Sequence, residues 1–216
     1  MEIWIAFSSF DEMEKAHDYP IKGVLTNPTV ISVLEMNWKK AVTRMNEIGN
    51  LPLGLQVVST QKDEMIEEID AFNRIIDKKR LIIKLPFCPG ALQVIPFIKK
   101  LGLEVNMAAI CTFTQAIVAL ETDIEYLSIY VGRVTDGGGD GIQLIRQIKD
   151  YVHRFQKSTV IMAASIRTVK QLEEVALAGA DAAVITFNVL EEAMKSRLTV
   201  ESIEKFSADW SKIARL

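Results

Sequence analysis

The clearest structural signal lies in residues 81–110, which read LIIKLPFCPGALQVIPFIKKLGLEVNMAAI. Apolar residues dominate 81–85 and 105–110, and such short runs predict two buried strands. Between them, residues 91–101 carry apolar side chains at helical spacing, and Gly102 is the expected C-terminal stop of that helix. A strand, a helix and a second strand in this order are typical of a parallel βαβ unit.

The same alternation occurs about eight times along the chain, which predicts a parallel sheet. Strands are expected near Ile3–Ala6, Gly23–Leu25, Gly54–Val58, Leu81–Leu85, Val105–Ile110, Tyr126–Val131, Val160–Ala164 and Ala182–Ile185. The best-defined helices are expected at Lys62–Ile75, Ala91–Leu101, Ile142–Phe155 and Val169–Leu177, the last followed by Gly179. Eight units favour a compact (β/α)8 TIM barrel of the α/β class. The alternative is a doubly wound open sheet, but no Gly-x-Gly-x-x-Gly follows the first strand.

The length and composition indicate one globular domain. The chain has 216 residues, of which 49% are hydrophobic and 25% charged. We expect a single barrel domain over residues 1–216, including an amphipathic helical tail at 200–216 that could cover the barrel or a neighbouring subunit. No apolar stretch approaches the roughly 18–20 residues of a membrane span, and no signal sequence is evident. A cytoplasmic location without a membrane partner is therefore expected.

Charge and metal-ligating residues exclude two classes of function. A net charge of −3 argues against a nucleic-acid partner, because nucleic-acid modules usually carry a basic surplus. The two cysteines, Cys88 and Cys111, lack the paired spacing of a metal site. The two histidines, His17 and His153, are too few for an imidazole-based zinc or iron site. We expect no metal and no cofactor.

Lys84 is a single charged residue inside the apolar run 81–85. Burying an unpaired ammonium is costly and favours loss of its proton. A neutral lysine attacks carbonyl carbons to form Schiff bases. Strand alternation places Ile82 and Lys84 on one face and Ile83 and Leu85 on the other. If the first face is the barrel interior, Lys84 points into the mouth as a catalytic residue; alternatively, its stem is buried and its head reaches solvent.

Polar residues interrupt the apolar runs near the carboxyl ends of several predicted strands, where this fold carries its catalytic groups. They are Thr26, Asn27, Gln56, Lys84, Asn106, Tyr130, Arg133, Ser165 and Arg167. Each alone could be a structural residue satisfied by backbone groups, but together they predict a site on one rim. Arg133, Ser165 and Arg167 offer donors suited to a phosphate or carboxylate, although Arg167 could equally be a solvated residue at a helix start. The glycine-rich loop 135–141 lacks the Gly-Lys-Ser/Thr ending of a nucleotide P-loop.

Five segments carry a resemblance that covers nearly the whole chain in order. They are Leu25-Thr26-Asn27-Pro28-Thr29, Leu55-Gln56-Val57, Ile82-Ile83-Lys84-Leu85-Pro86, Tyr130-Val131-Gly132-Arg133 and Ala163-Ala164-Ser165-Ile166-Arg167. Together they resemble the small bacterial transaldolases, especially the fructose-6-phosphate aldolase subgroup. The resemblance implies a compact (β/α)8 barrel and metal-free class I aldolase chemistry on sugar or sugar-phosphate substrates. It also implies a homo-oligomer, a decamer of two pentameric rings whose C-terminal helix packs on a neighbour.

The resemblance also implies roles for individual residues. Lys84 looks like the Schiff-base lysine. Gln56 and Tyr130 look like the groups that hold the catalytic water. By the same resemblance, Asn27 and Thr26 bind the hydroxyls of a dihydroxyacetone unit, and the substrate phosphate is bound by Arg133 and Ser165 with support from Arg167.

Two positions depart from the family pattern. Ala6 stands where the family has an aspartate that handles a substrate hydroxyl proton, and Ala108 stands where it has a threonine that helps to position the water. One positioned acid–base group contributes about 10²–10⁴-fold, so weakened activity is expected. The leading prediction is an aldolase or transaldolase. The alternatives are an impaired relative that binds sugar phosphates or uses its amine on other carbonyl compounds, and a non-enzymatic scaffold.

Overall fold

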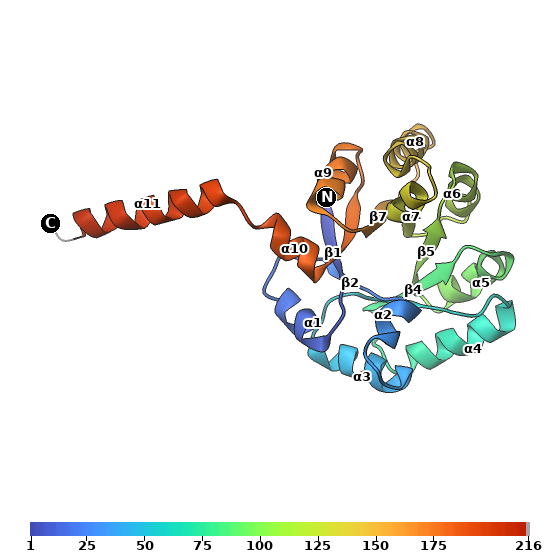
Figure 1. Ribbon diagram of the computed structural model, residues 1–216. Helices are drawn as coiled ribbons and strands as arrows, with labels where there is room; N and C mark the ends of the chain where they lie inside the picture. The colour runs from blue at the N-terminus through green and yellow to red at the C-terminus, as the bar shows by residue number, and fades with distance from the viewer. Residues whose placement is uncertain (215–216) are drawn as a thin grey trace.

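The computed structural model describes residues 1–214, which form a closed barrel of parallel strands surrounded by helices (Figure 1). The strand order around the barrel is the order along the chain, from β1 to β8, and β8 closes the barrel by pairing with β1. The strands are β1 Glu2–Ala6, β2 Gly23–Leu25, β3 Leu53–Gln56, β4 Leu81–Pro86, β5 Glu104–Ile110, β6 Tyr126–Tyr130, β7 Val160–Ile166 and β8 Ala182–Thr186. The predicted (β/α)8 fold is confirmed, and the open sheet is excluded.

Helices α1 to α9 connect successive strands around the barrel, and α10 and α11 follow β8 (Figure 1). They are α1 Phe10–Ala16, α2 Pro28–Ser32, α3 Trp38–Ile48, α4 Lys62–Asn73, α5 Pro89–Lys100, α6 Phe113–Leu120, α7 Val131–Asp136, α8 Gly141–Arg154, α9 Val169–Leu177, α10 Phe187–Ala193 and α11 Arg197–Ile213. Eight of them begin at a polar residue whose side chain accepts a backbone N–H of the first turn: Ser9, Asn27, Asn37, Thr112, Asp140, Thr168, Thr186 and Ser196. Gly102 and Gly179 follow α5 and α9 with positive φ values, as predicted for helix stops.

Alternation along the strands divides the core into two clusters of buried side chains. One fills the barrel interior and includes Trp4, Leu25, Ile82, Met162 and Val184. The other lies between the strands and the helices. Glycine is required in β2 and β3, because a Cβ at position 23 would lie 2.4 Å from the Trp4 ring and one at position 54 would lie 2.0 Å from Leu25 Cδ2. These two glycines make room for Trp4 and Leu25 in the interior.

Two irregularities shape the carboxyl-terminal rim. The pairing of β5 with β6 shifts between Met107 and Ile110, and that of β7 with β8 shifts between Ala163 and Ile166. Each irregularity contains one residue with positive φ, Ala109 at 61° and Ser165 at 62°. Bulges of this kind redirect side chains and are common near active sites. The strand β7 ends at Ile166, two residues beyond its predicted end at residue 164.

The chain differs from the prediction around residues 131–141. The sixth strand ends at Tyr130 rather than at 131, because α7 begins immediately after it. The expected loop at 135–141 therefore starts only at 137. The end of α7 is fixed by two hydrogen bonds: Thr135 Oγ1 donates to the Val131 carbonyl oxygen, and the Gly137 N–H donates to that of Arg133.

The predicted C-terminal tail forms α11, which extends away from the barrel (Figure 1). None of its residues is buried within the chain. Its exposed large hydrophobic residues are Leu198, Val200, Ile203, Phe206, Trp210 and Ile213. Residues 215 and 216 of the predicted tail lie outside the described residues. Within residues 1–214, no helix is long and apolar enough to cross a membrane.

Candidate active site

Lys84 occupies the inward face of β4 near the carboxyl end of the strand. Ile82 belongs to the interior cluster, whereas Ile83 and Leu85 face the helices, as the alternation predicted. Lys84 is only 5% exposed, and its Nζ donates a hydrogen bond of 3.0 Å to the carbonyl oxygen of Thr26. It forms no ion pair with any carboxylate of the described residues. A single neutral acceptor offsets little of the free-energy cost of burying a charged amine.

The pKa of Lys84 reflects this environment. Burial, and to a lesser extent the positive charge of Arg133, lower the pKa of the amine from 10.5 to about 8. With that value, about one lysine in ten is neutral at pH 7, compared with roughly one in three thousand for an unperturbed group. Lys84 therefore combines an inward position with a substantial neutral fraction.

A pocket of about 230 Å³ opens at the carboxyl-terminal rim above Lys84. Five residues singled out from the sequence line it: Asn27, Lys84, Tyr130, Arg133 and Ser165. Ala6 lines the same pocket, and most of the remaining walls are apolar. The pocket thus has a reactive amine, hydrogen-bonding groups and one guanidinium within an apolar enclosure.

Tyr130 lies between the two cationic side chains of the pocket. Its ring centroid is 6.0 Å from Lys84 Nζ and 5.0 Å from Arg133 Cζ. Burial raises the pKa of the Tyr130 hydroxyl, although Arg133 opposes the shift. The hydroxyl consequently stays protonated near pH 7 and can donate a hydrogen bond or a proton.

The helices that follow β2 and β6 position Asn27 and Arg133. Asn27 caps α2, and its Oδ1 accepts the Val30 N–H at 2.9 Å, which leaves the amide N–H groups available. Arg133 projects from the first turn of α7. This turn packs so closely on β7 that a Cβ at Gly132 would lie 2.3 Å from the Ser165 carbonyl oxygen. The contact brings Arg133 and Ser165 to one side of the pocket.

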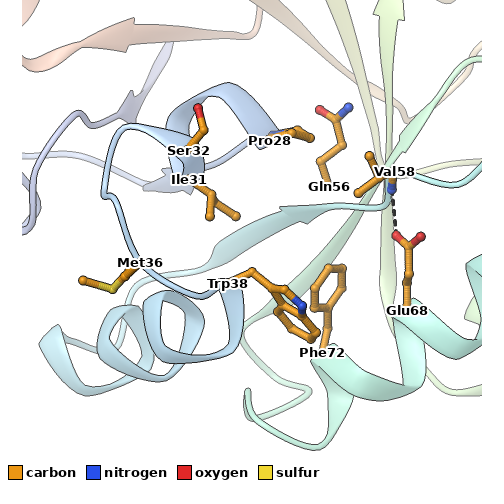
Figure 2. A pocket seen from close by; sticks show the side chains of 9 residues that line it. All are labelled: Pro28, Ile31, Ser32, Met36, Trp38, Gln56, Val58, Glu68 and Phe72. Atoms are coloured by element: carbon orange, nitrogen blue, oxygen red, sulfur yellow. Dashed lines mark hydrogen bonds between the residues drawn. The ribbon is translucent and has the colours of Figure 1, made fainter.

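Gln56 is separated from the pocket above Lys84. It is the register neighbour of Lys84 on β3, but its side chain lines a second cavity of about 410 Å³ that is mostly apolar. Figure 2 shows its amide above Trp38 and Phe72, with Pro28 on one side and Val58 on the other. The Gln56 Oε1 atom is buried and has no hydrogen-bond partner among the described residues. An additional donor, such as a water molecule, would satisfy this oxygen.

Two other predicted binding residues, Thr26 and Arg167, form hydrogen bonds outside the pocket above Lys84. Thr26 is fully buried, and its hydroxyl donates to the Gly54 carbonyl oxygen at 2.9 Å. Arg167 lies outside the lining of the pocket and forms a bidentate ion pair with Asp136, with distances of 3.0 and 2.6 Å. This ion pair lowers the pKa of Asp136 and raises that of Arg167. Neither side chain is directed into the pocket above Lys84.

Asn106 and Ser128 form a buried polar pair inside the barrel. Ser128 Oγ donates to Asn106 Oδ1 at 2.8 Å, and Asn106 Nδ2 lies 3.4 Å from the Met162 sulfur. Asn106 is also the register neighbour of Lys84 on β5. From the sequence, Asn106 was identified only as a polar interruption, and Ser128 was missed. The signal for Ser128 was a small polar residue in the middle of an apolar strand.

Both departures from the family pattern are placed in the interior. Ala108 is fully buried in the interior cluster. Ala6 lines the pocket and also a neighbouring cavity that includes Glu12. Glu12 accepts hydrogen bonds from the Ser8 N–H and hydroxyl at 2.7 and 2.9 Å, so its carboxylate is engaged at the start of α1. Within residues 1–214, no group of three or more His, Cys, Asp or Glu residues is arranged to hold a metal ion.

Comparisons with known proteins assign the sequence to one family. The sequence model of the family described as "Transaldolase/Fructose-6-phosphate aldolase" matches residues 3–216. The chain belongs to this family. It is 34% identical over 217 residues to the "Probable transaldolase" of Caldicellulosiruptor saccharolyticus, with 100% of this chain and 99% of the relative covered. It is 32% identical over 216 residues to the "Probable transaldolase" of Aquifex aeolicus, with 99% and 98% covered.

A third transaldolase-family relative shows the same extent of similarity. The "Probable transaldolase 1" of Listeria monocytogenes is 33% identical over 213 residues, which cover 97% of this chain and 98% of the relative. The match therefore includes the barrel and α11 together. The predicted membership of the transaldolase family is confirmed.

Proposed function

We propose that the protein is a class I aldolase or transaldolase that cleaves sugar phosphates through a Schiff base on Lys84. The observation that carries the proposal is the buried amine of Lys84, whose pKa is lowered to about 8 at the mouth of a transaldolase-family barrel. A neutral amine in a dry pocket is the form of lysine that attacks a ketone. No metal or cofactor takes part in this chemistry.

The proposed reaction begins at the amine of Lys84. The Nζ lone pair attacks the ketone carbon, and loss of water from the resulting carbinolamine gives an iminium ion. The iminium withdraws electrons as the bond between the third and fourth carbons of the ketose breaks. Breaking this bond releases an aldehyde and leaves an enamine, provided that a base removes the proton of the fourth-carbon hydroxyl. Protonation and hydrolysis of the enamine adduct then release dihydroxyacetone and regenerate the amine.

Tyr130 and Gln56 are proposed to manage the water of the dehydration and hydrolysis steps. The raised pKa of Tyr130 keeps its hydroxyl protonated, so that it can protonate the departing hydroxide directly or through a water molecule. The unpartnered Oε1 of Gln56 offers an acceptor to such a water. Because Gln56 lines a different cavity from the pocket above Lys84, its participation requires a water molecule that links its amide to that pocket.

The substrate phosphate is proposed to bind at Arg133 and Ser165. Arg133 forms no ion pair with the described residues, and its guanidinium fork matches phosphate oxygens. Ser165 lies beside α7 on the same side of the pocket. The free amide N–H groups of Asn27 suit the hydroxyls of the dihydroxyacetone unit. Fructose 6-phosphate carries both the phosphate and the dihydroxyacetone hydroxyls that these residues would bind.

Activity with fructose 6-phosphate tests the proposal. Cleavage should give dihydroxyacetone and an aldose phosphate, and adding a second aldose phosphate should reveal any transfer of the three-carbon unit. Lys84→Met should abolish both activities. Lys99→Met is the matched control, because Lys99 donates only to the carbonyl oxygens of Thr122 and Asp123. Equal losses in the two variants would contradict the assignment.

A second candidate function rests on Ala6 and Ala108. Without the aspartate and threonine of the family pattern, the protein could bind sugar phosphates or use its amine on other carbonyl compounds with little cleavage. A covalent adduct on Lys84 together with negligible turnover of fructose 6-phosphate would favour this candidate.

We also propose that the protein is a homo-oligomer, a decamer of two pentameric rings, in which α11 packs on a neighbouring copy. The support is the apolar stripe of α11, which the rest of residues 1–214 leaves uncovered. Sedimentation velocity should show a large species that dissociates in Phe206→Ser/Trp210→Ser. A monomeric wild-type protein would contradict this proposal.

A further inference from the structure

Asp136 and Arg167 bridge two segments of the rim that are far apart in the sequence. Asp136 ends α7, one turn beyond Arg133 on the same helix, and Arg167 follows β7. Both guanidinium N–H groups of Arg167 that bond Asp136 are directed at separate oxygens of one carboxylate. The fork that would fit a phosphate is thus already occupied by a carboxylate.

This arrangement changes the charge available to an anion in the pocket. Arg133 is a lining residue without an ion-pair partner among the described residues, whereas the positive charge of Arg167 is neutralised by Asp136. A phosphate dianion would therefore meet one free guanidinium rather than two. The carboxylate of Asp136 also opposes its approach.

A bound anion can nevertheless replace Asp136 as the partner of Arg167. The side chains of Arg167 and Asp136 are 55% and 56% exposed, and exposed pairs are weakened by water and salt. Ser165 and Ile166, which immediately precede Arg167, line the pocket. Arg167 itself lines the adjoining cavity, which shares Thr186 with the pocket. The competition requires that rotation of the Arg167 side chain brings its guanidinium to a phosphate bound at Arg133 and Ser165.

We propose that Asp136 is a specificity-determining residue that competes with the substrate phosphate for Arg167 and so weakens the affinity of the pocket for phosphorylated ligands. The inference rests on the proposed function for the location of the phosphate, but it does not depend on Schiff-base formation. Asp136 touches no reacting atom. Its effect is on ground-state binding of the charged group, and it leaves uncharged ligands unaffected.

Calorimetric titration with inorganic phosphate tests the competition. Asp136→Asn should tighten phosphate binding by about 3- to 10-fold, because an arginine released from an exposed pair gains a charge-assisted contact. In Asp136→Asn/Arg167→Gln this gain should disappear. Glu174→Gln is the matched control, since it removes a carboxylate from the exposed Lys170 pair on the neighbouring α9 without touching Arg167. Its effect should stay under about 2-fold.

Three results would overturn the inference. Weaker phosphate binding in Asp136→Asn would mean that Asp136 positions Arg167 for the anion. Unchanged binding would mean that there is no competition. An equal gain in the double variant, whose net charge equals that of the wild type, would mean that the gain does not come through Arg167.

A second readout separates this inference from the proposed function. In a turnover assay, Asp136→Asn should lower KM for fructose 6-phosphate and leave kcat unchanged. If phosphate affinity changes as expected but dihydroxyacetone forms no adduct on Lys84, the inference holds and the proposed function fails. If an adduct forms on Lys84 but phosphate affinity is unaltered, the Schiff-base function is supported and the inference fails.

Discussion

The Nζ atom of Lys84 lies 3.0 Å from the carbonyl oxygen of Thr26, the residue that precedes Asn27 at the end of β2. This hydrogen bond orients the amine but supplies no negative charge. Desolvation therefore exceeds any stabilisation of the ammonium, and the pKa falls to about 8. A carboxylate in the place of this carbonyl oxygen would have raised the pKa of the amine.

The first prediction concerns the pH dependence of Lys84. Because the pKa is lowered from 10.5 to about 8, the neutral fraction rises as the pH increases through 8. The rate of modification by an amine-specific reagent, followed by peptide mapping, should rise to a plateau above this pH. The same shift makes folding more favourable as the pH rises from about 8 to 10.5, since only the unfolded chain then keeps the proton. A modification midpoint near 10.5 would contradict the prediction.

Arg133 is predicted to act on both the amine and the phosphate. Its charge is the second cause of the lowered Lys84 pKa, so Arg133→Gln should raise that pKa while burial keeps it below 10.5. Arg133→Lys retains the charge and should leave the pKa near 8, but it should bind phosphate less tightly because it lacks the fork. The modification profile and phosphate titration measure the two effects. A Lys84 pKa that falls or stays constant in Arg133→Gln would refute the claim that the charge of Arg133 lowers it.

Ala6→Asp should restore the acid–base group that the family pattern places at this position. Ala6 lines the pocket, so a carboxylate there would face the substrate. We expect kcat/KM for fructose 6-phosphate cleavage to increase by about 10²–10⁴-fold. Ala6→Asn, which has the same size but cannot take up a proton, is the control. Equal rates in both variants would show that the first strand does not limit cleavage.

The buried pair of Asn106 and Ser128 is predicted to contribute to stability. Ser128→Ala leaves Asn106 Oδ1 without its donor and should lower the free energy of unfolding by about 1–3 kcal/mol. Asn106→Leu/Ser128→Ala removes both polar groups, and its cost should be less than the sum of the single costs. Urea unfolding at one fixed protein concentration measures these values. Strict additivity would mean that the hydrogen bond contributes no coupling.

Most of the barrel was predictable because its signals are local. The strand cores are continuous apolar runs, and the boundaries of Gly23–Leu25 and Val169–Leu177 were predicted correctly. Alternation placed Lys84 on the same face as Ile82, and the structure shows that this face is the barrel interior. Helix α7 directly after β6 was missed, because Val131 continues the apolar pattern of the strand and no residue typical of a helix start separates the two elements.

The candidate site was less predictable because it depends on distant contacts. The ion pair of Arg167 with Asp136 joins residues that are 31 positions apart, and no local pattern identifies Asp136 as the partner. The side chain of Gln56 was expected to hold the catalytic water together with Tyr130, but alternation does not determine which cavity a long side chain enters. Ser128 was overlooked because a serine in an apolar strand has no distinctive spacing.

Borohydride trapping with dihydroxyacetone, followed by peptide mapping, tests the role of Lys84 most directly. Reduction should fix the iminium as a stable secondary amine, so the mass increase should lie on the peptide that contains Lys84. Lys84→Met should show no increase, while Lys99→Met should match the wild type. Absence of an adduct on Lys84 near pH 8, or an adduct that persists in Lys84→Met, would contradict the Schiff-base account.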